Sequence, residues 1–276
     1  MVVRKSLGLT LLVVFFVGIF SAQGFSAEEI VPGGQYNLVD YEKLSGKEIT
    51  SFSEAPQLAE LVEQGELPPV EERIPQNPVV VEPVEEIGQY GGTWRRYGHL
   101  ASETYGYIAS YEPLVRFAQD GVSIEPNIAE EWEVSEDGKT FTFYLCKGIR
   151  WSDGEPFTAD DIMFWYEDII LNKELTPVPP SWLMAGGEVA KFDKIDDYTV
   201  KVSFVEPYAI FLETLALYGG GRIPYAPKHY LSQFHLKYVS EEELGSMTKE
   251  AGFEHWYQLF GQKNDIYSNP DLPVIY

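Results

Sequence analysis

Polar and apolar residues alternate along two neighbouring stretches of the chain, and the spacing changes soon after them. The stretches are Glu131–Ser135 and Thr140–Lys147, and Asp137-Gly138 lies between them. Alternation with period two is typical of a half-buried strand, and Asp-Gly favours a tight turn because glycine tolerates positive φ. The pattern therefore predicts a β-hairpin. Phe141, Phe143 and Leu145 are expected on one face, and Thr142 and Tyr144 on the other.

Beyond the hairpin, apolar residues recur every three or four positions, which predicts a helix. Thr158 and Asp161 have the spacing of an N-cap and its reciprocal partner in a capping box. The apolar stripe behind them consists of Ile162, Trp165, Ile169 and Ile170. A strand–turn–strand unit followed by a capped helix is expected between residues 126 and 170.

Similar patterns predict further elements on both sides of this unit. Strands are expected at Thr93–Tyr97, at Val115–Ala118 and along the alternating residues Ile195, Val200, Val202 and Phe204; Ile108–Leu114 is expected to be a helix or a turn. Helices are expected from Pro207, with Phe211, Leu212 and Leu215 on one face, and from Ser240, which would form a capping box with Glu243.

The first 24 residues have the layout of a secretory signal peptide. Arg4 and Lys5 precede the uncharged apolar run Leu7–Phe20, and small residues follow it, so that cleavage is expected after Gly24 or Ser26. The alternative is a membrane anchor, but the apolar run of 14 residues is shorter than the roughly 20 that span a bilayer. No cysteine lies near the cleavage region, so a lipid anchor is not expected.

Residues 25–88 are predicted to form an N-terminal extension. A helical stretch at Ala55–Gln64 follows Ser53, which is expected to cap it. Residues 66–86 are rich in proline and glutamate, and this composition favours an extended arm over a central strand or helix. The apolar residues Val79, Val80, Val81 and Ile87 indicate that the arm packs along the domain. A disordered linker is the alternative.

The amino-acid composition of the chain argues against several classes of function. The chain has 20 Lys and Arg against 43 Asp and Glu, a formal net charge of −23, so it repels nucleic acid and anionic membrane surfaces. Apolar residues make up 45% of the chain, which is sufficient for a core. The single cysteine, Cys146, excludes an internal disulfide and a cysteine-based zinc cluster.

Several sequence motifs in and around these elements resemble those of a known protein family. The stretch PNIAEEWEVSEDGKTFTFYL at the hairpin, with KGIRWSDGEPFTADDI after it, resembles the signature of the family 5 extracellular solute-binding proteins, the receptors of ABC importers. YGGTWRR at Tyr90–Arg96, YEPLVRF at Tyr111–Phe117, DDYTVKVSFVEPYAIFLETL at Asp196–Leu215 and PYAPKHYLSQFH at Pro224–His235 extend the resemblance. Cys146 departs from it, because the family usually has arginine there; a small, partly buried role is expected for this residue.

The resemblance implies a fold of the α/β class with mixed α+β sheets. It implies a lobe like that of type II periplasmic binding proteins, with its core in residues 89–122 and 218–276 and an inserted subdomain in residues 123–217. Family members have two lobes and are about twice as long, so the resemblance also implies an N-terminal piece without the second lobe.

The function implied by the resemblance is that of a periplasmic, monomeric receptor that passes a small solute to an ABC permease, with no enzymatic activity and no cofactor or metal. Oligopeptides are the first expectation for the solute, oligosaccharides the second and nickel complexes the third. Two other classes remain open. They are a secreted carbohydrate-active enzyme, since paired carboxylates are abundant, and a structural cell-surface module.

Candidate ligand-binding residues are polar and aromatic residues in loops that border the cleft in the family. They are Glu103, Tyr105 and Tyr107 after the strand at Thr93–Tyr97, Trp182 between Pro179-Pro180 and Gly186-Gly187, and Tyr218 before a glycine run. Aromatic rings offer stacking surface for sugars or peptide side chains, while Tyr OH and Trp NH groups orient a ligand. The alternative is that each ring is half-buried packing. Trp132, Trp151 and Trp165 are expected in the core.

The histidines and the acidic residues of the sequence do not form a recognised catalytic or metal-binding motif. The four histidines are scattered, and His229 and His235 are expected to be surface or capping residues. The acidic group Asp153, Glu155, Asp160 and Asp161 resembles a calcium site in composition only, because it lacks the alternating oxygen ligands of an EF-hand. Asp153-Gly154 is better explained as a turn.

Overall fold

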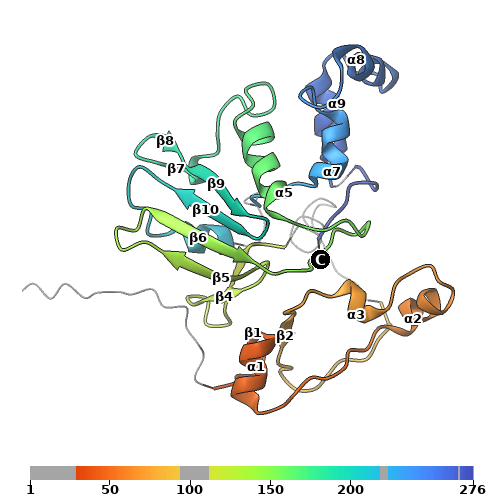
Figure 1. The fold of residues 1–276 in the computed structure, drawn as a ribbon, viewed down its shortest axis with the longest axis vertical. Helices are drawn as coiled ribbons and strands as arrows, with labels where there is room; N and C mark the ends of the chain where they lie inside the picture. The colour runs from red at the N-terminus through yellow and green to blue at the C-terminus, as the bar shows by residue number, and fades with distance from the viewer. Residues whose placement is uncertain (1–28, 94–111, 218–222, 267, 276) are drawn as a thin grey trace, which may run out of the picture.

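A four-stranded antiparallel sheet lies at the centre of the described chain (Figure 1). The computed structural model describes residues 29–93, 112–217, 223–266 and 268–275. The sheet contains β5 (Ala129–Val134), β6 (Thr140–Leu145), β9 (Lys191–Asp196) and β10 (Thr199–Ser203), in the order β5-β6-β10-β9. The predicted hairpin is confirmed: β5 pairs with β6, and Gly138 in the turn has a φ of 65°.

One face of this sheet is apolar and covered. Phe141, Phe143 and Leu145 are buried and alternate with half-buried polar positions, as the sequence predicts. Phe141 and Phe143 lie against Phe211 of α6 (Phe211–Ala216), with the Phe141 and Phe211 ring centroids 4.9 Å apart. Across the sheet, Phe192 stacks on Tyr166 at 4.7 Å. The core is therefore an aromatic layer between the sheet and two helical segments.

The second of these segments is the predicted capped helix. α5 (Ala159–Phe164) continues directly into a π-helical segment, η1 (Trp165–Ile170). Thr158 and Asp161 form the complete capping box, which confirms the prediction. Buried residues include Ile162, Trp165 and Ile170, so the apolar stripe faces the core.

Two small hairpins and a short helix complete the body. β3 (Val115–Phe117) pairs with β4 (Ile124–Pro126), and β7 (Met184–Ala185) pairs with β8 (Glu188–Val189) after the 3-10 helix η2 (Ser181–Leu183). The helix expected from Pro207 begins only at Phe211, because residues 208–210 form a turn in which Tyr208 N donates to Gly138 O. Ile195 is on β9, not in the strand of Val200 and Val202, and its side chain is exposed.

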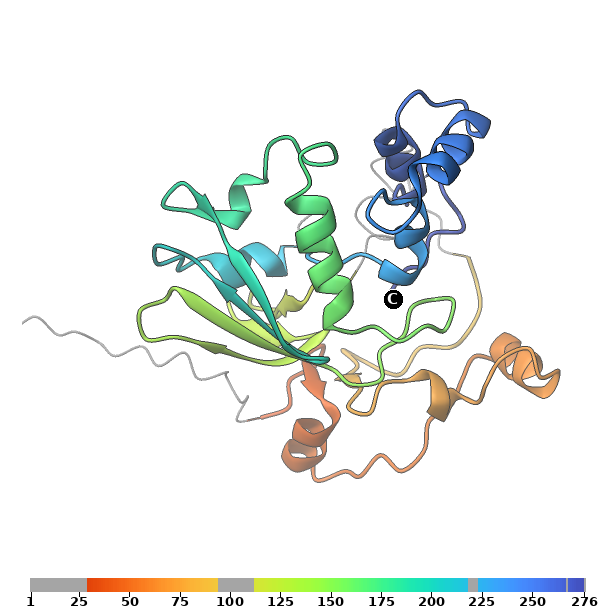
Figure 2. The same ribbon diagram turned by 45° about the horizontal axis from the view of Figure 1, so that its top comes forward.

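The N-terminal extension lies at one end of the molecule (Figures 1 and 2). Its elements are β1 (Gln35–Asn37), α1 (Leu38–Ser45), α2 (Pro56–Glu63), α3 (Val70–Arg73) and β2 (Val79–Val81), and β1 pairs with β2. The predicted Ser53 cap is wrong: Ala55 occupies the N-cap without a side-chain bond, and Pro56 opens the helix.

The extension contacts the body directly, which favours the packed arm over a disordered linker. Gln76 N donates to Lys147 O at 2.8 Å, and the Asn37 side chain donates to Glu130 O at 2.9 Å. The proline-rich arm still contains the short helix α3 and the strand β2. The strand is possible because its three residues lie between prolines and pair with only one other strand, β1.

A small helical unit lies at the opposite end of the molecule (Figure 2). It comprises α7 (Lys228–Leu231), the 3-10 helix η3 (Ser232–Phe234), α8 (Glu241–Glu250) and α9 (Trp256–Lys263). Ser240 caps α8 by accepting from Glu243 N. Most of the strand predicted at Thr93–Tyr97, and residues 108–111, lie outside the described residues. No helix in the described part has the length and apolar character needed to cross a membrane.

Candidate functional site

Trp182 is the one predicted ligand-binding residue within the described part of the chain. Glu103, Tyr105, Tyr107 and Tyr218 lie outside the described residues. Trp182 is half-buried in η2, and its ring stacks on Trp165 with centroids 6.0 Å apart and an interplanar angle of 25°. The ring is thus packed on one neighbour and still partly exposed, which is compatible with both roles considered from the sequence.

The loop around Trp182 is held by its backbone. Leu183 is completely buried, its N–H donates to Pro180 O at 3.0 Å, and its carbonyl accepts from Ala190 N at 2.7 Å. These bonds anchor η2 between the prolines and the β7–β8 hairpin. Of the other tryptophans in the signature, Trp151 and Trp165 are buried as predicted, and Trp132 is half-buried.

A cavity of about 370 Å³ lies between the N-terminal extension and the body. The extension contributes residues from β1, from α3 and from the segment that leads into β2, and the body contributes residues from β3 and from the chain around β6. The lining includes Gln35, Arg73, Asn77, Val79, Val81, Arg116, Asn127, Ile128, Cys146, Ile149 and Arg150. No sequence pattern indicates this site, because its two walls are far apart in the chain.

Three arginines give the cavity a polar wall. Arg73 forms an ion pair with Glu54, and Arg116 forms one with Glu112, four residues earlier in the chain. Arg150 donates from Nη1 to the carbonyl of Gly154 at 2.9 Å. Cys146 also lines the cavity, and burial raises the pKa of its thiol to about 12, so it is a neutral group there. The thiol is fully buried, not partly buried as expected.

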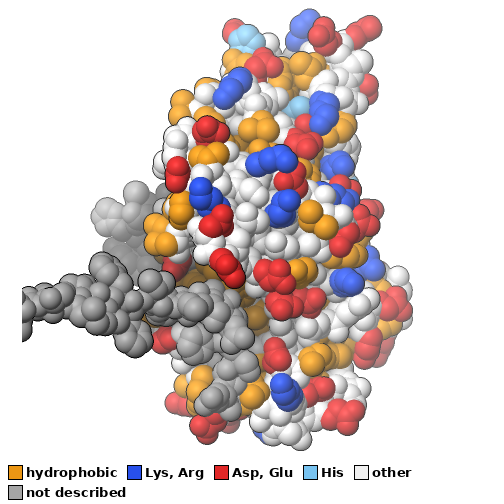
Figure 3. Space-filling model, turned by 60° about the vertical axis from the view of Figure 1, so that its left-hand side comes forward, with side chains coloured by type: hydrophobic (Ala, Val, Ile, Leu, Met, Phe, Trp, Pro, Cys, Tyr) orange, Lys and Arg blue, Asp and Glu red, His pale blue; other side chains and the backbone are white. Residues whose placement is uncertain are grey.

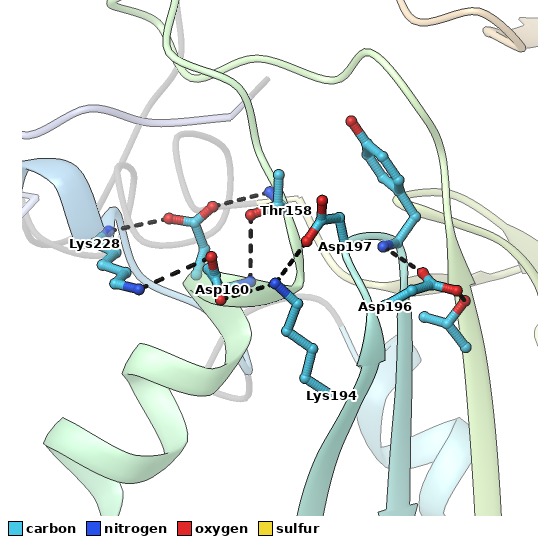
Figure 4. A network of polar contacts seen from close by, with 9 residues as sticks. Thr158, Asp160, Lys194, Asp196, Asp197 and Lys228 are labelled. Atoms are coloured by element: carbon cyan, nitrogen blue, oxygen red, sulfur yellow. Dashed lines mark hydrogen bonds and ion pairs between the residues drawn. The ribbon is translucent and has the colours of Figure 1, made fainter.

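Two residues of the acidic group that resembled a calcium site, Asp160 and Asp161, belong to a structural junction (Figure 4), whereas Asp153 pairs with His229. Lys194 Nζ contacts Asp160 at 3.0 Å and Asp197 at 2.7 Å. Asp161 is buried and accepts from Thr158 N and Lys228 N, both at 3.0 Å. Burial raises the pKa of Asp161 against the opposing effect of these two N–H groups. The carboxylates therefore tie α5 to β9 and α7.

Asp153-Gly154 is a turn, with Gly154 at φ 93°, as predicted. The described residues contain no group of three or more His, Cys, Asp and Glu side chains that could hold a metal. On the face drawn in Figure 3, acidic and basic side chains are interspersed.

A polar cluster around the buried residues Asp168 and His235 joins η1 to the helical unit. The Asp168 carboxylate accepts from Lys237 Nζ at 2.7 Å and from Tyr238 OH at 2.5 Å. His235 is 3% exposed, so it is not a surface residue, but it is the C-cap of η3, as the capping alternative predicted. Its Nδ1 accepts from Lys237 N at 3.1 Å and its Nε2 lies 3.0 Å from Asp168 O, which requires the neutral Nε2–H form. Burial lowers the pKa of His235. In the sequence, the charged residue Asp168 within the apolar stripe is the feature that could have indicated this polar cluster.

The chain is similar in sequence to a family of known proteins. Residues 123–253 match the family described as bacterial extracellular solute-binding proteins, family 5 Middle. The periplasmic alpha-galactoside-binding protein of Rhizobium meliloti (strain 1021) is 31% identical, and the match covers 84% of this chain and 38% of that protein.

Two solved structures resemble the fold over most of its length. A structure described as oligopeptide-binding protein OppA has a TM-score of 0.80 and 43% identity, covering 88% of this chain and 38% of its own. The periplasmic binding protein MelB from Agrobacterium fabrum C58, in complex with stachyose, has a TM-score of 0.63 and 27% identity, covering 92% of this chain and 38% of its own. The chain therefore spans 38% of the length of each of these three relatives.

Proposed function

Because the chain belongs to the family 5 extracellular solute-binding proteins, we propose that it serves as part of an extracytoplasmic receptor that delivers oligopeptides or a related solute to an ABC importer. The observation that carries this proposal is the resemblance to an oligopeptide-binding protein at 43% identity and a TM-score of 0.80. The receptor is proposed to be monomeric and to work without a cofactor or metal, and the partner is a membrane permease. Proteins of this family bind solutes and do not transform them.

An oligosaccharide is the second candidate solute. Two relatives that match more than four fifths of this chain have names that refer to alpha-galactosides or stachyose. The half-buried Trp182 offers a partly exposed ring for sugar stacking. We propose that Trp182, together with Glu103, Tyr105, Tyr107 and Tyr218, lines the solute cleft.

Export is proposed to follow from cleavage of the N-terminal signal after Gly24 or Ser26. N-terminal sequencing of the exported protein tests this step. An intact Met1 in a membrane fraction would contradict cleavage.

The function is tested by calorimetry with short peptides and with stachyose. A cleft with one wall buries too little of a solute, so this chain alone is expected to bind more weakly than micromolar, and a protein that also carries a second lobe is expected to bind one of the two solutes tightly. Chromatography of the recovered solute serves as the control for enzymatic activity. Release of shorter sugars or peptides would favour a secreted enzyme, and failure of the two-lobed protein to bind any small solute would contradict the receptor function.

A further inference from the structure

We infer that the cavity between the N-terminal extension and the body is a binding site for a small organic carboxylate with an apolar body. The inference is independent of the transported solute. The family match begins at residue 123, whereas much of the cavity wall comes from the extension, between Gln35 and Val81. The cavity is therefore formed partly by residues outside that match and partly by residues within it.

Positive charge is the first argument. Arginines are scarce in this acidic chain, yet Arg73, Arg116 and Arg150 all line one cavity. Arg73 and Arg116 each have a carboxylate partner, and the partner of Arg116, Glu112, also lines the cavity, so Arg150 carries the charge that is not offset by a paired carboxylate. Among the described residues Arg150 forms no ion pair, and its one described bond goes to a backbone carbonyl. The guanidinium fork of arginine fits a carboxylate with two parallel hydrogen bonds.

Two buried polar atoms in the wall form no hydrogen bond within the described part of the chain. They are Arg116 Nε, a donor, and Asn77 Oδ1, an acceptor. The orientation of the Asn77 amide follows from its nitrogen, which donates to Glu130 Oε2 at 3.0 Å. Buried polar atoms are almost always hydrogen-bonded in folded proteins. Both atoms have almost no accessible surface, so hydrogen bonds from a ligand to them require the Arg116 and Asn77 side chains to turn towards the cavity.

The remaining wall sets the size and the apolar part of the ligand. Val79, Val81, Ile128 and Ile149 contribute aliphatic surface. A volume of about 370 Å³ lies at the lower end of the range of about 300–1,000 Å³ for small-molecule sites. A carboxylate, an adjacent N–H and one aliphatic side chain together describe an N-acylated apolar amino acid, which is also the chemistry of a peptide C-terminus.

Binding in this cavity would fasten the extension to the body. Few direct bonds cross the boundary near the cavity: Gln76 N donates to Lys147 O, and Asn77 donates to Glu130. A ligand held by Asn77 on one side and by Arg116 and Arg150 on the other adds contacts across the same boundary. Hydrogen exchange of residues 73–81 should therefore slow when the ligand binds.

The probe is N-acetyl-L-leucine, with N-acetyl-L-leucinamide as a matched ligand that lacks the carboxylate. Calorimetry at low ionic strength should detect the acid at a Kd below about 1 mM and the amide at least about ten-fold weaker. Arg150→Gln and Arg116→Gln should each weaken binding of the acid several-fold. Lys201→Gln, which removes the same charge from β10, should leave it unchanged, since Lys201 is paired with Asp193 and does not line the cavity.

Equal binding of the acid and the amide would overturn the proposal, and so would absence of binding. Binding of the acid that neither arginine replacement weakens would also overturn it, because the acid would then occupy another site such as the solute cleft. Thermal melts show whether each variant folds. Arg150 is exposed, so Arg150→Gln keeps the test informative if Arg116→Gln does not fold.

Discussion

Replacement of Trp182 by alanine separates a packing role from a ligand-binding role. The indole stacks on Trp165 at 6.0 Å and remains partly exposed, so it can contribute to both stability and binding. Both quantities can be measured on the same variant.

The stability effect follows from the packing. A tryptophan buries about 150–250 Å² when fully covered, so a half-buried ring removes about 100 Å² from water, or about 2.5 kcal/mol at 25 cal/mol/Å². The stacked pair adds about 1 kcal/mol. Because the unfolded chain already buries part of this surface, we expect Trp182→Ala to lower the free energy of unfolding by about 2–3 kcal/mol, measured by urea denaturation.

The binding effect follows from the exposed part of the ring. Loss of one stacked aromatic contact weakens affinity by about 1–3 kcal/mol, which corresponds to a five- to 150-fold increase in Kd, measured by calorimetry on the two-lobed receptor proposed above. Trp165→Ala is the control. Trp165 is 8% exposed, so its removal should cost about 3–5 kcal/mol of stability, and because it supports the Trp182 ring, it should lower affinity in the folded fraction less than Trp182→Ala does.

Two results would contradict these expectations. Unchanged solute affinity in Trp182→Ala would remove Trp182 from the ligand site. A stability loss below about 1 kcal/mol would show that the stack on Trp165 does not contribute in solution.

Three further predictions concern buried groups. Because the pKa of His235 is lowered in the folded chain, the unfolded chain takes up a proton first as the pH falls. The free energy of unfolding should therefore decrease below about pH 6.5, by at most about 1.4 kcal/mol per pH unit. Urea melts of His235→Gln should lack this decrease, and a pH dependence equal to that of the unmodified protein would show that His235 is not its cause. Asp161→Ala leaves the N–H groups of Thr158 and Lys228 without their acceptor and should cost about 2–5 kcal/mol; Asp161→Asn should cost less, and equal losses would contradict the argument. Cys146, with a pKa of about 12, should react with iodoacetamide only after unfolding, and rapid labelling of the native protein at pH 8 would show that the thiol is accessible.

The elements that the sequence predicted well depend on interactions between residues close together in the chain. The β5–β6 hairpin follows from alternation and the Asp137-Gly138 turn, and the start of α5 follows from the Thr158–Asp161 capping box. Turn and cap chemistry act over a few residues, so they are visible in one stretch of sequence. The family motifs, which contain these same residues, predicted the family correctly.

Predictions failed where a local pattern allowed more than one outcome. Ser53 is a good capping residue, but the helix starts at Pro56 with Ala55 as its N-cap. Ile195 lies five positions before Val200, an odd spacing that does not fit the period-two alternation of Val200 and Val202, and a turn places it on the neighbouring strand, where it is exposed. A pattern of residue types cannot by itself distinguish one strand from two strands joined by a tight turn.

Tertiary structure alone decided which distant residues meet. The Asp168 cluster joins residues about 70 positions apart, and the arginine-lined cavity brings Arg73 of the extension next to Arg116 and Arg150 of the body. No short-range pattern predicts such pairs, because the paired residues are far apart in sequence and meet only in the folded structure. Burial of His235 has the same origin: it depends on Phe164, Trp256 and Phe260 packing around the ring, and that packing exists only once the helical unit has docked on η1.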